Sequence, residues 1–172
     1  MRAVVWISEN TWEGCVERAR AVIPDRAEIT LLHVSPTDVE DVVERGRISL
    51  LGRRPPPPPG PPVRAIAAEE AQSLLAQAQT RLGRPADLVS RRGRVEREVV
   101  QACADADLVV LARDGKPRLG PPSLGPRVRF VVDHAPCQVL LVWAYEPPAV
   151  ETIPAPPERG EASPRPRGGG TP

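Results

Sequence analysis

The sequence lacks long apolar runs and carries almost no net charge. No stretch approaches the roughly 18 consecutive apolar residues that a membrane-spanning helix needs, and the N-terminal region has no long apolar core typical of a secretory signal. The 23 basic and 22 acidic side chains leave a net charge of +1, which gives no general attraction to nucleic acid or anionic membranes. We therefore expect a cytoplasmic protein that binds neither nucleic acid nor a membrane.

Cysteine and histidine are also scarce. Cys15, Cys103 and Cys137 are widely spaced and form no Cys-x-x-Cys pair, which favours reduced, buried thiols. His33 and His134 show no metal-ligand spacing, and the position of His33 inside an apolar segment is typical of a hydrogen-bonded core histidine. No Gly-x-Ser-x-Gly motif supports a hydrolase triad. The sequence thus predicts no metal site and no catalytic residues, and we do not expect an enzyme.

Proline is abundant, and most of it lies in two regions. Residues 52–62 predict a polyproline II spacer or exposed loop, and a ligand for an SH3-type groove is the alternative. Residues 144–172 hold eight prolines, four glycines and few large apolar side chains, which predicts a disordered tail. The globular domain is expected to span residues 1–143, with 52–62 as an internal Pro-rich insertion.

Strand-like and helical patterns alternate along this domain. Strands are expected at 2–8, 27–34, 87–91, 108–112 and 139–143, and helices at 12–23, 65–82 and 94–104, with a short helix within 37–49. Residues 128–135 fit either type, but Pro126 after Gly125 favours a helix because proline suits the first helical position. Such alternation predicts a parallel sheet covered by helices on both faces. Ligands bind such sheets at the carboxyl ends of strands, where the winding direction reverses.

A glycine-containing loop connects the strand expected at 108–112 to the helix expected at 128–135. Glycines between a buried strand and a helix start allow the backbone to approach a phosphate. The loop and its surroundings resemble the C-terminal half of the universal stress protein domain, which carries Gly-x2-Gly-x9-Gly-Ser/Thr at this place. The resemblance rests on LVVLARDGKPRLGPPSLGPR from Leu108 and on DHAPCQVLLV from Asp133. The four motif positions read Ala112, Gly115, Gly125 and Pro126.

The resemblance implies a Rossmann-like α/β fold with a five-stranded parallel sheet of order 3-2-1-4-5. It also implies a crevice between the first and fourth strands, where ATP-binding members hold the nucleotide. Ser8 matches the aspartate that family members place near the adenine, Glu9 would replace it if the turn shifts by one residue, and Val34 matches an adenine contact. The cofactor-binding residues expected by resemblance are Ser8, Glu9, Val34, Ala112, Arg113, Gly115, Gly125, Pro126 and Arg127.

Two features of the loop have opposite effects on its ability to bind phosphate. Ala112 adds a methyl group, and Pro126 removes both an amide hydrogen and a hydroxyl; Pro117, Pro121 and Pro122 remove further amide donors. Against this loss, residues 113–129 hold five basic side chains and one acid, and guanidinium groups can bind phosphate without backbone help. A solvated basic loop is the simpler interpretation of the same charges.

Three functions follow from these observations. By resemblance, the chain is a non-catalytic stress-response or regulatory domain that binds an adenine nucleotide, with ATP as the cofactor. The alternative is a nucleotide-free interaction scaffold that has lost ATP binding and forms a homodimer through Val139 to Trp143. A hydrolase of the broader nucleotide-binding fold group is the third, and it would show phosphate release that disappears in Arg113→Ala.

Overall fold

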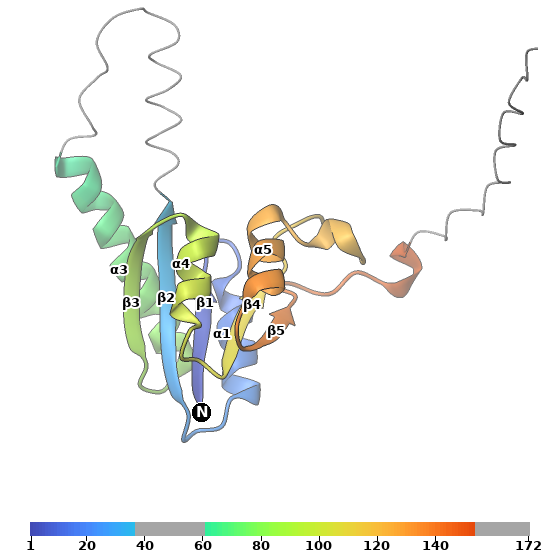
Figure 1. The fold of residues 1–172 in the computed structure, drawn as a ribbon, viewed down its shortest axis with the longest axis horizontal. Helices are drawn as coiled ribbons and strands as arrows, with labels where there is room; N and C mark the ends of the chain where they lie inside the picture. The colour runs from blue at the N-terminus through green and yellow to red at the C-terminus, as the bar shows by residue number, and fades with distance from the viewer. Residues whose placement is uncertain (37–60, 154–172) are drawn as a thin grey trace, which may run out of the picture.

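The structure, a computed structural model, describes residues 1–36 and 61–153. Its centre is a five-stranded sheet in which all neighbouring strands run parallel. The strands are β1 (Arg2–Ile7), β2 (Glu28–Pro36), β3 (Asp87–Gly93), β4 (Leu108–Ala112) and β5 (Gln138–Val142). They lie in the order β3-β2-β1-β4-β5 (Figure 1). The predicted fold class and strand order are therefore confirmed.

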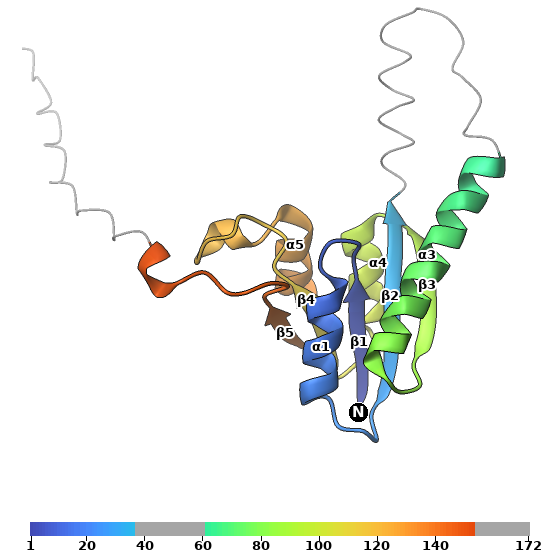
Figure 2. The same ribbon diagram turned by 180° about the vertical axis from the view of Figure 1, so that it is seen from behind.

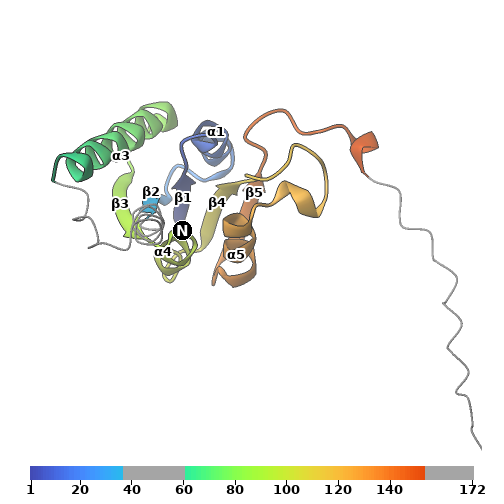
Figure 3. The ribbon, with the colours of Figure 1, turned by 90° about the horizontal axis from the view of Figure 1, so that it is seen from above.

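Helices cover both faces of this sheet. On one face lie α1 (Trp12–Val22) and α3 (Pro61–Leu82), as the view from behind shows (Figure 2). On the other lie α4 (Val95–Ala102) and α5 (Pro126–His134), and the view from above separates the two helical layers (Figure 3). Two short 3-10 helices, η1 (Pro121–Ser123) and η2 (Val150–Thr152), follow β4 and β5. Within the described residues, no helix is long and apolar enough to span a membrane.

The central strand β1 contributes to two separate hydrophobic clusters. Its residues Ala3, Val5 and Ile7 pack with the α1 and α3 side chains, whereas Val4 and Trp6 pack with those of α4 and α5. Alternate residues of a strand point to opposite faces, so an uninterrupted apolar run is what a strand needs when helices cover it on both sides. All five side chains are at most 7 % exposed.

Helix α3 begins earlier than the sequence pattern predicted. It starts at Pro61, not at residue 65, so the last two residues of the predicted proline-rich insertion belong to a helix. Proline lacks an amide hydrogen, but the amides in the first turn of a helix have no partner within the helix. Prolines can therefore open this helix. The rest of the insertion, and the short helix expected within 37–49, lie outside the described residues.

The folded region also extends beyond Trp143, where the predicted tail begins. Tyr145 donates a hydrogen bond from its hydroxyl to the carbonyl of Asn10 at 2.7 Å. A Cβ atom on Gly14 would lie 2.7 Å from the Cα of Ala144, so α1 and this segment are in close backbone contact. Tight contact with the start of α1 overrides the proline-rich composition of the segment as far as these residues.

The cysteines are free, as expected. Cys15 and Cys103 are buried, but Cys137 is only half-buried. Burial raises the pKa of both buried thiols from 9.0 to about 12, and a nearby Cys137 contributes to the shift at Cys103 through its charge and a hydrogen bond. The side chain of His33 lies 3.0 Å from the carbonyl oxygen of Ile7 through Nδ1, which gives it the hydrogen-bonded structural position predicted for it.

Candidate functional site

The winding direction of the sheet reverses between β1 and β4. From β1 the chain continues to β2 on one side, while β4 pairs with the opposite side of β1. In open α/β sheets, ligands bind at the carboxyl ends of the strands at such a point. Ser8 follows β1 and Arg113 follows β4, so the topology places both at this edge.

The turn after β1 is organised by backbone atoms. The carbonyl of Ser8 accepts hydrogen bonds from the amides of Thr11 at 2.9 Å and Trp12 at 3.0 Å, which leads the chain directly into α1. The side chains of Ser8 and Glu9 are exposed. Neither has a hydrogen-bonded partner among the described residues, so this half of the predicted site is open to solvent.

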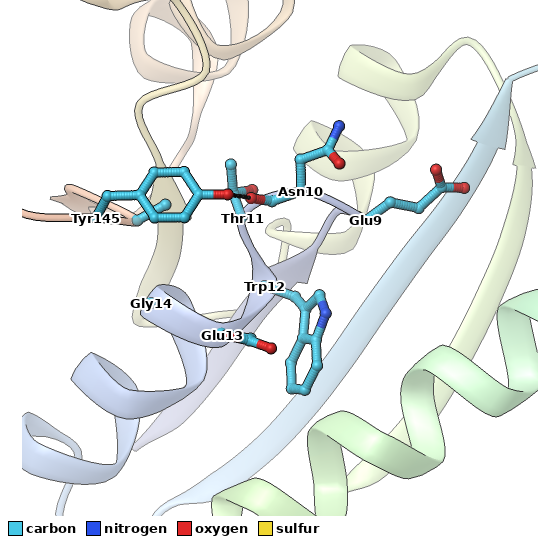
Figure 4. A pocket seen from close by; sticks show the side chains of 8 residues that line it. Glu9, Asn10, Thr11, Trp12, Glu13, Gly14 and Tyr145 are labelled. Atoms are coloured by element: carbon cyan, nitrogen blue, oxygen red, sulfur yellow. Dashed lines mark hydrogen bonds between the residues drawn. The ribbon is translucent and has the colours of Figure 1, made fainter. Parts of the chain in front are cut away.

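A cavity of about 180 Å³ lies where this turn meets the segment after β5. Its walls include Glu9, Glu13, Trp12 and Tyr145. Figure 4 shows the Tyr145 ring directed at the turn, where its hydroxyl contacts the carbonyl of Asn10. The Glu9 side chain points away from Tyr145. Tyr145 is not among the site residues predicted from the sequence, because 135 positions separate it from Asn10.

Val34 and Ala112 lie at the same edge with their side chains buried. Val34 is 4 % exposed and belongs to the cluster beneath α4 and α5, whereas Ala112 is 5 % exposed and belongs to the cluster beneath α1 and α3. Only the backbone of Val34 is therefore suited to the adenine contact that the resemblance implied. The methyl group of Ala112 fills core space.

The loop between β4 and α5 folds back on itself. The amide of Gly115 donates to the carbonyl of Ser123 at 2.9 Å, and the amide of Lys116 donates to the carbonyl of Pro122 at 2.8 Å. A Cβ on Gly115 would lie 2.4 Å from the Pro122 carbonyl oxygen, far below a normal contact. Gly115 is thus needed for the close approach of two parts of the same loop.

Gly125 is the N-cap residue of α5, and it faces a carboxylate. Its amide donates to Oδ1 of Asp114 at 2.7 Å. A Cβ on Gly125 would lie 2.7 and 2.8 Å from the two oxygens of that carboxylate, so the acid lies directly against the helix start. Pro126 opens the helix, as predicted, and its first turn contains no acidic residue. Asp114 supplies the negative charge that a helix N-terminus favours.

Arg113 is held by the interior of the loop and by an aromatic ring. Its Nη1 donates to the hydroxyl of Ser123, and that hydroxyl donates to the carbonyl of Gly120 at 2.7 Å. The guanidinium also lies over the ring of Trp143, 4.9 Å from the centroid, which is cation–π geometry. Ser123 is completely buried. Its role as an internal anchor was not predicted, since no sequence motif surrounds it.

The other basic residues divide into two groups. Arg129 donates to the carbonyl of Pro121 at 2.6 Å and so supports the loop. Lys116, Arg118 and Arg127 are exposed, and they leave the outer surface of the loop positively charged.

Arg127 also acts on the neighbouring helix. Burial opposes ionisation of Glu96, but a hydrogen bond from its own amide, the hydrogen bond and charge of Arg94, and the charge of Arg127 together lower its pKa. Arg94 Nε lies 2.6 Å from Glu96 Oε1. The first turns of α4 and α5 are therefore linked electrostatically.

No group of three or more metal-ligating side chains occurs within residues 1–36 and 61–153. His134 lies near the C-terminal end of α5, with its Nδ1 2.8 Å from the carbonyl of Phe130, and it is not part of the crevice. The arrangement offers polar and charged contacts at the β1–β4 edge.

A comparison with protein-family models matches residues 15–142 to the universal stress protein family. A search of curated proteins finds no match. Among solved structures, a universal stress protein in complex with cAMP has 14% sequence identity and a TM-score of 0.56, covering 84% of this chain and 98% of that one. A hypothetical protein whose biochemical function was assigned from its structure has 18% identity and a TM-score of 0.57, covering 83% and 94%. These structures support the fold.

Proposed function

The chain belongs to the universal stress protein family, and from this premise we propose that it is a non-catalytic regulatory domain that works without a bound adenine nucleotide. Of the two non-catalytic functions that the sequence suggested, this is the nucleotide-free scaffold. The fold and the crevice are those of a nucleotide-binding family, and one relative has been solved in complex with cAMP. The hydrogen bonds within the β4–α5 loop favour a different use of that fold here.

The observation that carries this proposal is the use of backbone amides between residues 113 and 126. Four of these 14 residues are prolines and have no amide hydrogen. Seven of the remaining amides donate to acceptors within the chain. Among the described acceptors none pairs with the other three amides, those of Asp114, Leu119 and Gly120. A loop that binds phosphate needs several amides directed at the ligand, and this loop directs most of its amides at itself.

The arginine side chains of the loop are not free to bind phosphate in place of the missing amides. Arg113 would have to leave Ser123 and the face of Trp143 before it could bind a phosphate, and Arg129 would have to leave the Pro121 carbonyl. Ser123 is buried, so its hydroxyl would lose the hydrogen bond from Arg113 in an environment where a lost hydrogen bond is costly. Binding a nucleotide therefore requires breaking existing interactions.

Calorimetric titration with Mg²⁺-ATP, AMP and cyclic AMP tests this proposal, together with thermal unfolding at millimolar ligand. A ligand at 100 times its dissociation constant stabilises the folded state by about 2.7 kcal/mol, which is easily measured. We expect no heat of binding and an unchanged melting temperature. A nucleotide-binding universal stress protein in the same buffers is the positive control. Saturable binding of any of the three nucleotides would refute the proposal.

We further propose that the domain acts as a homodimer through Val139 to Trp143. Strand β5 lies at the edge of the sheet and pairs only with β4 within the described residues. Val139, Leu140 and Leu141 are half-buried, whereas the corresponding residues of β4 are fully buried. An edge strand with unpaired backbone groups and apolar side chains is well suited to pair with a second copy.

Light scattering coupled to size-exclusion chromatography tests the dimer. We expect a dimer at micromolar concentration and a monomer for Leu140→Glu. The matched control is Leu88→Glu, because Leu88 lies on β3 at the opposite edge and is 42 % exposed; this variant should remain dimeric. Circular dichroism checks that both variants fold. A monomeric parent protein, or a Leu88→Glu variant that dissociates as readily as Leu140→Glu, would exclude β5 as the interface.

A further inference from the structure

The strongest unexplained feature of the loop is the acid beside the start of α5. Asp114 is the only acidic residue among residues 113–129, which contain five basic ones. Its Oδ1 accepts the Gly125 amide at 2.7 Å, and both of its oxygens lie within 2.8 Å of where a Gly125 side chain would begin. The carboxylate therefore occupies the space in front of the helix N-terminus.

Asp114 forms no ion pair within the described residues, although basic side chains surround it in the sequence. Arg113, its neighbour, bonds instead to Ser123, and Arg129 bonds to a backbone carbonyl. The carboxylate thus faces the helix amide without a neutralising cation. A negative charge in this position is favourable for the helix, and it repels any second anion that approaches the same amides.

We propose that Asp114 is a specificity-determining residue that excludes phosphate groups from the crevice. Its carboxylate fills the position at the N-terminus of α5 where an oxyanion would otherwise be accepted, and its charge opposes phosphate entry along the basic loop. This inference rests on the proposed function, because it explains how a crevice of this family works without a nucleotide. Removal of the carboxylate frees the Gly125 amide and exposes the positive end of α5, and the chain gains affinity for phosphate-bearing ligands.

The test compares Asp114→Ala with the parent protein, with inorganic pyrophosphate and Mg²⁺-ATP as probes. The control is Asp133→Ala, which makes the same change in net charge on an exposed residue in the last turn of α5. We expect Asp114→Ala to bind pyrophosphate about tenfold more tightly than Asp133→Ala, a difference of about 1.4 kcal/mol. Asp114→Asn keeps the size of the side chain and loses its charge, so it should gain less than Asp114→Ala.

The outcomes separate this inference from the proposed function. If the parent protein binds ATP, the proposed function is wrong. If the parent does not bind and Asp114→Ala folds but binds neither probe, the exclusion by Asp114 is wrong and the proposed function stands. Equal gains in Asp114→Ala and Asp133→Ala would indicate a general charge effect and would also overturn the inference. If Asp114→Ala fails to fold, the same comparison is made with Asp114→Asn, and absence of any gain there overturns it.

Discussion

Replacement of Gly115 by alanine should destabilise the protein even though this glycine lies on an exposed loop. The added Cβ would lie 2.4 Å from the carbonyl oxygen of Pro122 and 2.6 Å from the carbonyl carbon of Ser123. Both are backbone atoms, which cannot turn away as the end of a side chain can. The two parts of the loop must therefore separate by roughly 1 Å to reach a normal contact.

The magnitude follows from the hydrogen bonds that join these two parts. Separation breaks the bonds from the Gly115 and Lys116 amides, at 2.9 and 2.8 Å, and each contributes about 1 kcal/mol net. Alanine restricts the unfolded chain and returns about 0.4–1 kcal/mol. We expect a net loss of about 1–1.6 kcal/mol in the free energy of unfolding, with a melting temperature lower by about 2–6 °C.

Urea unfolding of Gly115→Ala and Gly125→Ala provides the measurement. Gly125 is the control because its φ of −68° suits any residue, and the atoms that its Cβ would meet belong to the movable Asp114 carboxylate. Rotation of that exposed carboxylate loses one hydrogen bond, which the alanine entropy term offsets in part, so Gly125→Ala should lose less stability than Gly115→Ala. A Gly115→Ala protein as stable as the parent would refute the packing explanation.

Two further predictions concern stability. Burial raises the pKa of Cys15 from 9.0 to about 12, so the folded protein keeps a proton that the unfolded chain loses above pH 9.0. The contribution of Cys15 to stability is therefore fully present below that pH and falls by about 1.4 kcal/mol per pH unit as the pH rises towards 12. Urea unfolding of Cys15→Ala should accordingly show a shallower decline of stability with pH than the parent protein. The side chain of Arg84 is 15% exposed and donates hydrogen bonds to the carbonyls of Ile23 at 3.1 Å and Pro24 at 2.9 Å. Arg84→Ala should therefore lower the free energy of unfolding by about 2 kcal/mol, measured by thermal or urea unfolding. The control Arg81→Ala breaks an exposed ion pair, so its stability should remain close to that of the parent.

Much of the fold could be predicted because buried strands and helices have repeating patterns. The run Leu108–Ala112 is entirely apolar and forms a strand with the predicted bounds. The ambiguous region after it was assigned correctly as a helix, since Pro126 supports a helical start and the buried residues Val128 and Val131 share one face. The predicted start of α3 was too late because Pro61 and Pro62 were assigned to a polyproline II spacer, whereas prolines are also compatible with the first turn of a helix.

The contacts of the candidate site were harder to predict. The spacing of the glycines located the loop, but it could not show that the loop folds onto itself, because that depends on hydrogen bonds between residues whose separation has no regular period. Asp114 entered the sequence analysis only as one negative charge, yet it lies beside Gly125, 11 positions later. The signal that could have identified it is its isolation as the only acid in a basic segment.

The two retained glycines have structural reasons to persist whether or not a nucleotide binds. Gly115 allows the two parts of the loop to meet, and Gly125 leaves space for a carboxylate of the same chain. The first glycine of the family motif is replaced here by Ala112, whose methyl group is buried in the core, so that position is used for packing. In this chain, the glycine spacing is therefore explained by the loop conformation alone. The donors that remain unpaired, and the charge in front of the helix that follows, are the features that decide whether the loop can hold a phosphate.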